Sequence, residues 1–347
     1  MRDKKQAPYS VIVTSLVILL FAAVVFSITA GRFSLPLPLI IKVFAAEISG
    51  GNTGANDSLI QAANILFIVR LPRIFLAILV GASLSLAGAA YQGIFKNPLV
   101  SPDILGVTHG AGTGAALGIL LGIFTGGIQL ISFGFGIGTV LIVLSLTKIF
   151  GGGRNATVIL ILTGTIMNAF FASIISFMKY MADADSKLPE IVFWLMGSFA
   201  RSGNSRNVII MFFIFIIAGA PLFALRWWIN VLSLGDNEAM SLGLNTKRLR
   251  TIIIGSATLL TAASVCFCGT IQWVGLIIPH VSRLLVGPDN RRLFPVAAIL
   301  GGLFMLVVDG FARAIIPGEL PVGVLTAFIG APLFLYMLFS GKKEWAA

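Results

Sequence analysis

The stretch LGDNEAMSLGLNTKRLR, residues 234–250, separates two long apolar segments and so decides where the chain leaves an apolar environment. Asn207–Leu225, which precedes it, contains 19 residues without a charge, and Thr251–Ser282, which follows it, contains 32. A helix that crosses a bilayer needs about 20 apolar residues. The stretch is therefore expected to face water and to connect membrane-spanning segments.

Local signals within residues 234–250 predict a short helix. Asp236 is placed to cap a helix that runs to Leu242, because its carboxylate can accept hydrogen bonds from the free N–H groups of a first turn. Glu238 lies near the start of that helix, where a negative charge suits the helix dipole. Gly243 is a suitable C-terminal stop. We therefore expect a folded connection.

A second helical turn is expected to begin at Asn245 or Thr246 and to end in the basic residues Lys247, Arg248 and Arg250. Two interpretations of the whole stretch stay open. It is either an ordinary solvated connection, as most loops are, or a surface on which another protein docks.

The composition places the chain among polytopic membrane proteins. Hydrophobic residues make up 57% of its 347 residues and charged residues 11%, with a mean hydropathy of +1.00. A soluble domain carries roughly 25% charged residues. The net charge of +11 is attributed to basic residues in inner loops. No basic stretch interleaved with aromatic residues indicates binding to nucleic acid.

The uncharged segments predict an all-α protein with ten membrane-spanning helices and both termini on the inner side. The expected spans lie in residues 7–31, 74–95, 104–147 (two spans), 155–178, 207–225, 251–282 (two spans), 293–308 and 320–341. This topology places 15 of the 24 lysines and arginines inside, which has the sign of the positive-inside rule. Residues 32–64 are expected to form an outer loop with short helices.

Glycine and proline are expected to interrupt helices, because both weaken a helix interior. Gly269, Gly275 and Pro279 are predicted to divide the segment after residue 250 into a full helix and a shorter one. Pro189 is predicted to break the polar segment Ala182–Arg206.

An internal repeat is visible when the chain is compared with itself at an offset of 181 residues. Leu79–Gly106 and Leu260–Gly287 are identical at eight of 28 positions, where roughly two are expected by chance, which favours a duplicated unit. The copies begin at the second and seventh spans, so spans 2–5 and 7–10 should point in opposite directions. Inverted repeats are typical of transporters, with the pathway near the repeat interface.

The sequence contains no recognisable catalytic or metal-binding constellation. It has neither the G-x-x-x-x-G-K-[ST] loop that holds ATP phosphates nor the H-E-x-x-H pattern of zinc enzymes. Cys266 and Cys268 are expected to be small packing residues, and His109 and His280 to find structural partners.

One pair of charges is expected within the apolar part of the chain. Asp309 and Arg313 lie four residues apart, which predicts an ion pair on one helix face. A proton or ion relay would need more carboxylates in the membrane than this chain has. Uphill transport would therefore draw its energy from a partner.

Several longer motifs resemble those of a known family. They are RLPR (70–73), GASLSLAGAAYQGIFKNPLVSPDILGVTHGAG (81–112), WLMGS (194–198), LGDNEAMSLGLN (234–245), GLIIPHVSRLLVG (275–287) and GELPVGVLTAFIGAPLF (318–334). They are similar to the membrane subunits of type II ATP-binding cassette (ABC) importers for iron–siderophore, haem and cobalamin, the FecCD-type permeases. The resemblance covers residues 66–338. It implies a single permease domain over residues 1–347.

The resemblance also implies partners. It implies a homodimer in the cytoplasmic (inner) membrane with one central pathway, two cytoplasmic ABC ATPase subunits and an outer substrate-binding protein. ATP and Mg²⁺ would be bound by the ATPase, and this chain would hold no cofactor or metal itself.

Three groups of site residues are expected. Residues 227–250 would couple the permease to the ATPase through Asp236, Glu238, Met240, Leu242, Gly243 and Arg248. By resemblance, Arg70, Arg73 and Arg313 would accept glutamates of the binding protein, the alternative being contact with lipid phosphates. Also by resemblance, the fifth span would line the pathway, with Met167, Asn168 and Phe171 as wall residues.

Two classes of function stay open at this point. The chain is either the membrane subunit of an ATP-driven importer or a secondary transporter powered by an ion gradient, and co-purification of an ATPase would separate the two. The expected cargo is an iron–siderophore, with haem, cobalamin and an oxyanion as alternatives.

Overall fold

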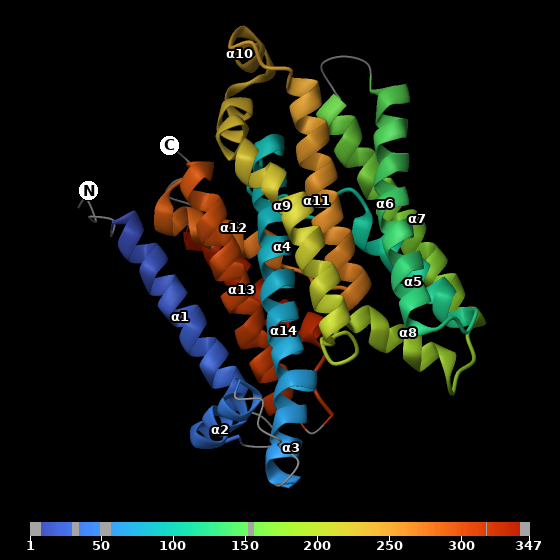
Figure 1. The fold of residues 1–347 in the computed structure, drawn as a ribbon. Coiled ribbons are helices and arrows are strands. Elements are labelled where there is room, and N and C mark those ends of the chain that lie inside the picture. The colour runs from blue at the N-terminus through green and yellow to red at the C-terminus, as the bar shows by residue number, and fades with distance from the viewer. Residues whose placement is uncertain (1–7, 30–34, 49–56, 152–155, 317, 341–347) are drawn as a thin grey trace.

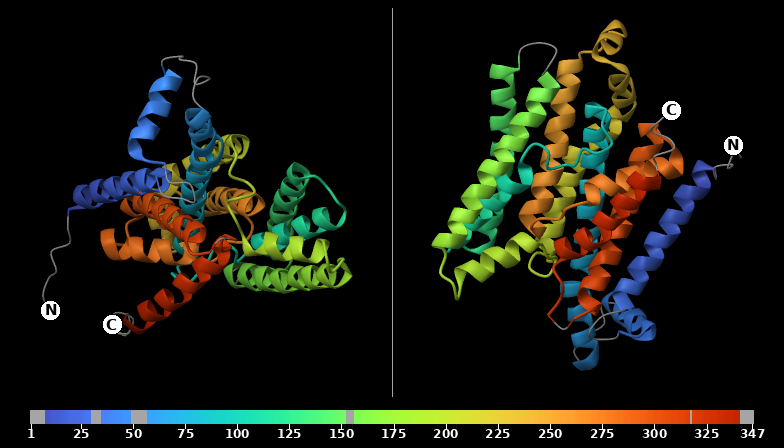
Figure 2. Two further views of the ribbon diagram at one scale, coloured as in Figure 1. Left: turned by 90° about the horizontal axis from the view of Figure 1, so that it is seen from below. Right: turned by 180° about the vertical axis from the view of Figure 1, so that it is seen from behind.

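The computed structural model describes residues 8–29, 35–48, 57–151, 156–316 and 318–340, and within these ranges it contains helices and no strand. In chain order the elements are α1 (Tyr9–Thr29), α2 (Leu37–Ile48), α3 (Asp57–Ala63), the π-helical turns η2 (Asn64–Arg70), α4 (Leu71–Phe95), α5 (Val107–Leu120), α6 (Thr125–Phe150), α7 (Ala156–Met181), α8 (Lys187–Met196), α9 (Ser205–Leu234), α10 (Asp236–Ser241), α11 (Thr246–Cys268), α12 (Val274–Val286), α13 (Asn290–Ala314) and α14 (Val322–Ser340). Most run lengthwise through one bundle (Figures 1 and 2).

The ten predicted spans are confirmed. Seven helical stretches within the described ranges are long and apolar enough to cross a bilayer: α1, the continuous stretch Asp57–Phe95, α6, α7, α9, α11 and α13. The shorter helices α5, α12 and α14 run beside them. α5 and α12 have 14 and 13 residues, about 20 Å at 1.5 Å per residue, which is less than the ~30 Å of a bilayer core. Each follows a non-helical segment, residues 96–106 and 269–273.

The inverted repeat is also confirmed. α4–α7 and α11–α14 follow the same order, and in both units a short helix comes second. α4 runs toward the end of the bundle that carries α10, whereas α11 runs away from it (Figure 1). We call these two ends the α10 end and the opposite end. The start of α1 and the end of α14 lie toward the α10 end (Figures 1 and 2).

α4 lies at the centre of the bundle because its small residues let other helices approach closely. Almost every side chain from Leu76 to Phe95 is buried, and the helix packs against α9, α11, α12 and α13. A Cβ atom on Gly88 would overlap the carbonyl oxygen of Gly275 in α12, and one on Gly81 would overlap that of Gly301 in α13. Backbone therefore meets backbone at both contacts, as in other closely packed membrane helices.

Several predicted boundaries are corrected. Residues 227–234, expected in the loop, continue α9, where Trp227 also makes a cation–π contact with Arg291 at 4.6 Å. The second span starts before the expected Ile74, since the chain is helical from Asp57 and accommodates Pro72 by the preceding π-helical turns.

Only one of the three expected interruptions after residue 250 is a break. Gly269 ends α11 with a φ of +73°, whereas Gly275 and Pro279 lie inside α12. Pro279 removes the N–H that would bond to the Gly275 carbonyl, which instead lies against Gly88. Pro189 does not break a helix either, because it lies in the first turn of α8, where no N–H is needed.

Asp289 organises the turn between α12 and α13 at the α10 end. Its carboxylate caps α13 by accepting from the Arg291 N–H at 3.0 Å, and it accepts from Asn230 of α9 at 2.7 Å. Hydrogen bonds from Arg291 and Asn230 lower the pKa of Asp289 to about 2. The carboxylate therefore stays ionised and ties α9 to α13.

The glycine contact at the centre of the bundle can be tested with matched substitutions. Gly88→Ala is expected to lower the thermal unfolding midpoint of the detergent-solubilised protein, because the added methyl group would push α4 away from α12. Gly255→Ala in α11 is the control, since a Cβ there meets nothing within 4 Å and alanine favours a helix by roughly 0.5–1 kcal/mol over glycine. Equal midpoints for the two variants would contradict this account.

Candidate functional site

The connection between α9 and α11, residues 235–245, protrudes from one end of the bundle (Figure 1). Its short helix α10 is followed by Gly243, which has a φ of +79°. Asn245 caps α11 by accepting from the Arg248 N–H at 2.9 Å. The predicted helix, glycine stop and second helix start are confirmed.

Asp236 does not have its predicted role as a helix cap. Gly235 is the N-cap, and Asp236 is the first residue of α10. Its carboxylate accepts from Arg250 Nη2 at 2.7 Å instead, because a charged donor binds a carboxylate more strongly than a backbone N–H does. This ion pair joins α10 to the second turn of α11 and so restrains the connection.

The surface of α10 and the residues that follow it, up to the start of α11, combines apolar and charged side chains. Met240 and Leu242 are 53% and 64% exposed, and Glu238 and Arg248 are also exposed. Methionine and arginine are enriched in protein–protein interfaces. This surface fits the docking interpretation, which stays a prediction.

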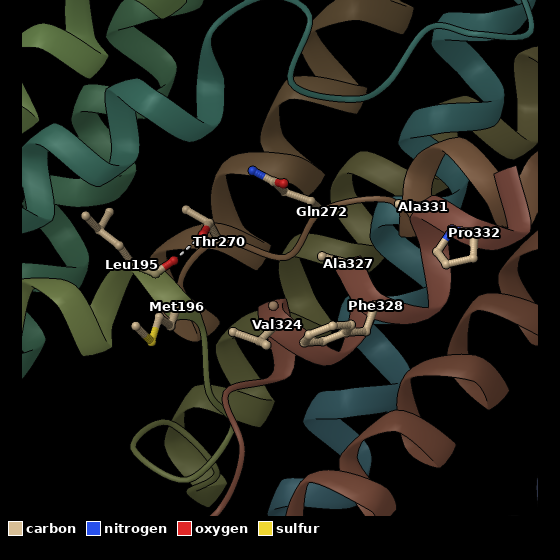
Figure 3. A pocket seen from close by; sticks show the side chains of 10 residues that line it. Leu195, Met196, Thr270, Gln272, Val324, Ala327, Phe328, Ala331 and Pro332 are labelled. Atoms are coloured by element: carbon tan, nitrogen blue, oxygen red, sulfur yellow. Dashed lines mark hydrogen bonds between the residues drawn. The ribbon is translucent and has the colours of Figure 1, made fainter. Parts of the chain in front are cut away.

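A groove of about 520 Å³ opens between α14, the end of α8 and the segment that joins α11 to α12 (Figure 3). It is lined by Leu195, Met196, Thr270, Gln272, Gly323, Val324, Ala327, Phe328, Ala331 and Pro332. The Thr270 hydroxyl donates to the Leu195 carbonyl and so joins the two walls. No charged side chain is among the lining residues, so the groove suits a large and weakly polar ligand.

A second cavity, of about 240 Å³, adjoins this groove at Gln272, which lines both. Its polar lining comes from the two non-helical segments and their neighbours and includes Ser101, Asp103, Thr108 and Thr261. The Ser101 hydroxyl donates to Asp103 Oδ1 at 2.7 Å. The smaller cavity therefore lies where the two repeats meet, as expected for the pathway of an inverted-repeat transporter.

Met167 and Phe171, the predicted wall residues of the pathway, point into the subunit, and their role in the pathway stays a prediction. The two side chains are 9% and 7% exposed and belong to the core of the subunit. The outward face of α7 carries Ile166 and Phe170 instead, which are 59% and 55% exposed. α7 carries polar side chains on both its inward and its exposed side, so its packing against α5 and α6 decides which side faces inward.

Asn168 lies on the inward side of α7 and holds the non-helical segment before α5. Its Oδ1 lies 2.9 Å from His109 Nδ1, and its Nδ2 donates to the Asp103 carbonyl at 3.2 Å. The structural partner expected for His109 is thus Asn168. The residue fixes the backbone that bounds the smaller cavity.

A buried group of charges joins α4 to α13 near the opposite end. Arg73 donates through Nη2 and Nε to Asp309 Oδ1, at 2.8 and 2.9 Å. Through Nη1 it donates to both carboxylate oxygens of Glu319, at 3.0 and 3.2 Å. Arg313 Nε lies 3.2 Å from Asp309 Oδ2, which confirms the predicted ion pair. The side chains of Asp309 and Arg73 are 0% and 8% exposed.

Arg313 and a further arginine, Arg70, also form hydrogen bonds with the end of α1. Arg70 Nη1 donates to the carbonyls of Ile28 and Thr29, and Arg313 Nη2 donates to Ser27 Oγ at 2.6 Å. Positive charges are favourable at a helix C-terminus. All three arginines expected to dock the binding protein are thus engaged within the subunit. An acidic partner would reach the buried Arg70 and Arg73 only after they exchange contacts.

Sequence reasoning missed two polar residues that connect the repeats. Glu319 is the second carboxylate partner of Arg73. Gln92 of α4 is 3% exposed, donates to the carbonyls of Val100 and Leu276, each at 3.2 Å, and accepts from Arg283. Both residues lie in the motifs quoted above, where an isolated polar residue in an apolar run was the available signal.

The chain offers few groups for metal binding. Within the described ranges, no three His, Cys, Asp or Glu residues are grouped closely enough to hold a metal ion. Cys266 and Cys268 are buried and not bonded to each other, which confirms their packing role.

Removing Arg73 is expected to destabilise the subunit. Arg73→Ala would leave Asp309 buried beside a single partner, and breaking such a buried pair costs about 3–5 kcal/mol. The thermal unfolding midpoint in detergent should fall clearly. Arg291→Ala, which removes a largely exposed partner of Asp289, should change the midpoint little. A similar small change for both variants would show that the buried pair contributes little to stability.

Comparison with known proteins agrees with this geometry. The profile of the FecCD transport family matches residues 18–340. The chain is 40% identical over 335 residues to the molybdate import system permease protein of Haemophilus influenzae, covering 96% of this chain and 97% of that protein. It is 36% identical over 278 residues to the Fe(3+) dicitrate transport system permease protein of Escherichia coli, covering 79% and 85%.

A solved structure is similar over the whole length. It is described as an inward-facing conformation of a metal-chelate type ABC transporter, and it matches with a TM-score of 0.82 and 38% identity over 96% of this chain and 99% of that one. Together with the family profile, this similarity assigns the chain plainly: it is a multi-pass membrane protein that belongs to the FecCD transport family of ABC importer permeases.

Proposed function

We propose that the chain is the membrane-spanning subunit of an ABC importer for a metal chelate, and that two copies enclose one pathway. The observation that carries this proposal is the geometry of α10. It is a short helix braced by the Asp236–Arg250 ion pair, with Met240 and Leu242 exposed at its surface. A rigid, partly apolar projection between two spans is suited to transmit a movement from a docked partner into the bundle.

The proposed partner at the α10 end is a cytoplasmic ATPase, one for each permease copy. The sequence has no P-loop of its own, so ATP and Mg²⁺ would be held by that partner. Glu238 and Arg248 would make polar contacts across the interface, and Met240 and Leu242 would fill a groove. The α10 end would then face the cytoplasm together with both termini, in agreement with the sign of the charge bias.

The second copy of the chain is proposed to close the groove beside α14. Exposed apolar side chains cover α7 and α14, among them Ile166, Phe170 and Phe328, and Figure 2 shows these two helices along one side of the bundle. A closed two-fold arrangement is the commonest assembly of identical subunits. In such a dimer the 520 Å³ groove of each copy would face the axis. The exposed side of α7 would then line the pathway in place of Met167 and Phe171.

We consider two classes of cargo, each supported by one observation. The groove has no charged lining residue, which suits a bulky chelate whose metal charge is neutralised by its ligands. A bare oxyanion is the second candidate, because the relative from Haemophilus influenzae is named for molybdate import. Titrating the cognate substrate-binding protein with molybdate and with ferric dicitrate, by calorimetry, would distinguish them.

An ion-gradient-driven transporter is the alternative mechanism. It would need neither an ATPase nor a protruding docking helix. ATP-dependent uptake into proteoliposomes that hold the permease and its ATPase, without any ion gradient, is the result expected for the importer. Uptake that follows a proton or sodium gradient and ignores ATP would refute the proposal.

Changes on α10 should separate the permease from its ATPase. Met240→Glu combined with Leu242→Glu should abolish co-elution of the ATPase in size-exclusion chromatography, because two charges would enter an apolar contact. Gly243→Trp should act similarly, since a side chain at a φ of +79° strains the turn. Leu121→Glu, which changes a 66% exposed side chain in the turn after α5, is the control.

The outcome of this experiment bears directly on the docking interpretation. If both α10 variants keep the ATPase bound and keep ATP-driven uptake, residues 235–245 are a solvated connection and the coupling surface lies elsewhere. If the Leu121 variant also loses the ATPase, the loss reflects general damage to the subunit.

A further inference from the structure

The guanidinium of Arg73 has two carboxylate partners on different edges. Asp309 occupies the edge formed by Nε and Nη2, and Glu319 accepts from Nη1 alone. A guanidinium presents five donors in a fixed fork, so one edge can change partner while the other stays bound. The geometry therefore divides the ion network into two separable contacts.

The two carboxylates differ in how firmly they are held. Asp309 is fully buried inside α13 and is also paired with Arg313. Glu319 lies in the connection between α13 and α14, and its side chain is 29% exposed. Its backbone has a φ of +57°, a conformation that is unfavourable for a residue other than glycine, asparagine or aspartate. Asp309 is thus the fixed partner of Arg73, and Glu319 is the one that can leave.

Glu319 is connected directly to the groove. The N–H of the next residue, Leu320, donates to the Ala312 carbonyl at 3.0 Å, and the Val322 N–H donates to the Gly197 carbonyl at 3.0 Å. α14 begins at Val322. A Cβ on Gly323 would overlap the carbonyl oxygens of Met196 and Thr270, so the start of α14 lies against the other walls of the groove. Glu319 is therefore only four residues from Gly323, which lies in the wall of the groove.

The charge balance of this region favours an incoming carboxylate. Arg70, Arg73 and Arg313 contribute three positive charges, and Asp309 and Glu319 contribute two negative ones. If Glu319 moved away without a replacement, the Nη1 donors of the buried Arg73 would lose their carboxylate partner. Leaving a buried charged group partly unpaired destabilises a protein. If an acidic side chain of another protein took its place, Arg73 would stay paired and Glu319 would be free in water.

We infer that Glu319 is a displaceable carboxylate that covers Arg73 in the undocked subunit and gives way to an acidic side chain of the substrate-binding protein, which releases the start of α14. This inference rests on the proposed importer function, in which that protein docks at the opposite end. Exchange of one carboxylate for another leaves no buried charge unpaired. It converts docking at the surface into movement of a helix that lines the groove.

The competing account treats Glu319 as a permanent structural partner of Arg73. The two accounts differ in the sign of one measurement. If Glu319 competes with the binding protein, weakening its hold on Arg73 strengthens docking. If Glu319 is permanent, weakening its hold leaves docking unchanged or disturbs the surface and weakens docking.

The test uses the full permease in lipid nanodiscs, assembled with its ATPase, and its purified cognate substrate-binding protein. Glu319→Gln keeps the shape of the side chain and removes its charge. The dissociation constant of the binding protein, measured by biolayer interferometry, should fall by about fivefold, the lower limit of typical coupling between sites. The ATPase rate without binding protein should rise toward the stimulated rate. Glu190→Gln is the matched control, since Glu190 is an exposed glutamate of α8, 46% exposed, and should change neither quantity.

Each result decides between the accounts. An unchanged or weaker affinity of the assembled Glu319→Gln complex overturns the inference. If that variant does not assemble, Glu319→Asp, which shortens the reach to Arg73 by one methylene, is measured instead and should also bind more tightly. Failure of both variants to assemble makes Glu319 a structural partner and overturns the inference too. A wild-type complex that does not bind the substrate-binding protein, or binds it equally well after Arg313→Gln, refutes the proposed docking itself.

Discussion

The close contact of α4 with α12 and α13 is the constraint on which the rest of the subunit depends. In a bilayer the lipid tails are as apolar as the side chains, so helices gain little from burying apolar surface against each other. Close packing of backbones supplies the attraction instead. Gly88 against Gly275 and Gly81 against Gly301 bring α4 of the first repeat against two helices of the second. These contacts hold the two repeats together as one body.

This packing makes the breaks in the helices possible. A non-helical backbone is tolerated at membrane depth only where protein surrounds it or where it lines a cavity. Gln92 of the central helix α4 donates to the Val100 carbonyl in the first broken region and to the Leu276 carbonyl in the first turn of α12, just after the second. Asn168 supports the first of these regions through the Asp103 carbonyl. The cavities beside the breaks are therefore consequences of how α4 is packed.

The two ends of the bundle present different kinds of surface to a partner. The α10 end presents exposed apolar side chains on a helix braced by an ion pair, and such a surface gains by burial. The opposite end presents buried arginines already paired inside the subunit, where a change of partner costs less than a loss. One end is thus suited to hold a partner continuously. The other is suited to exchange contacts with a partner that comes and goes.

The sequence by itself determined the spans, the inverted repeat, the polar connection at residues 234–250 and the Asp309–Arg313 pair. These features depend on long uncharged runs, on an offset within the chain or on a spacing of four residues, all of which are visible along the chain without knowledge of its contacts. Only the tertiary structure decided the partner of Asp236, the inward direction of Met167 and the contacts of Arg73. Arg73 lies 236 residues from Asp309, so no spacing rule connects them. α7 carries polar residues on both its inward and its exposed side, such as Asn168 and Ser173, so its orientation is set by the helices that pack against it.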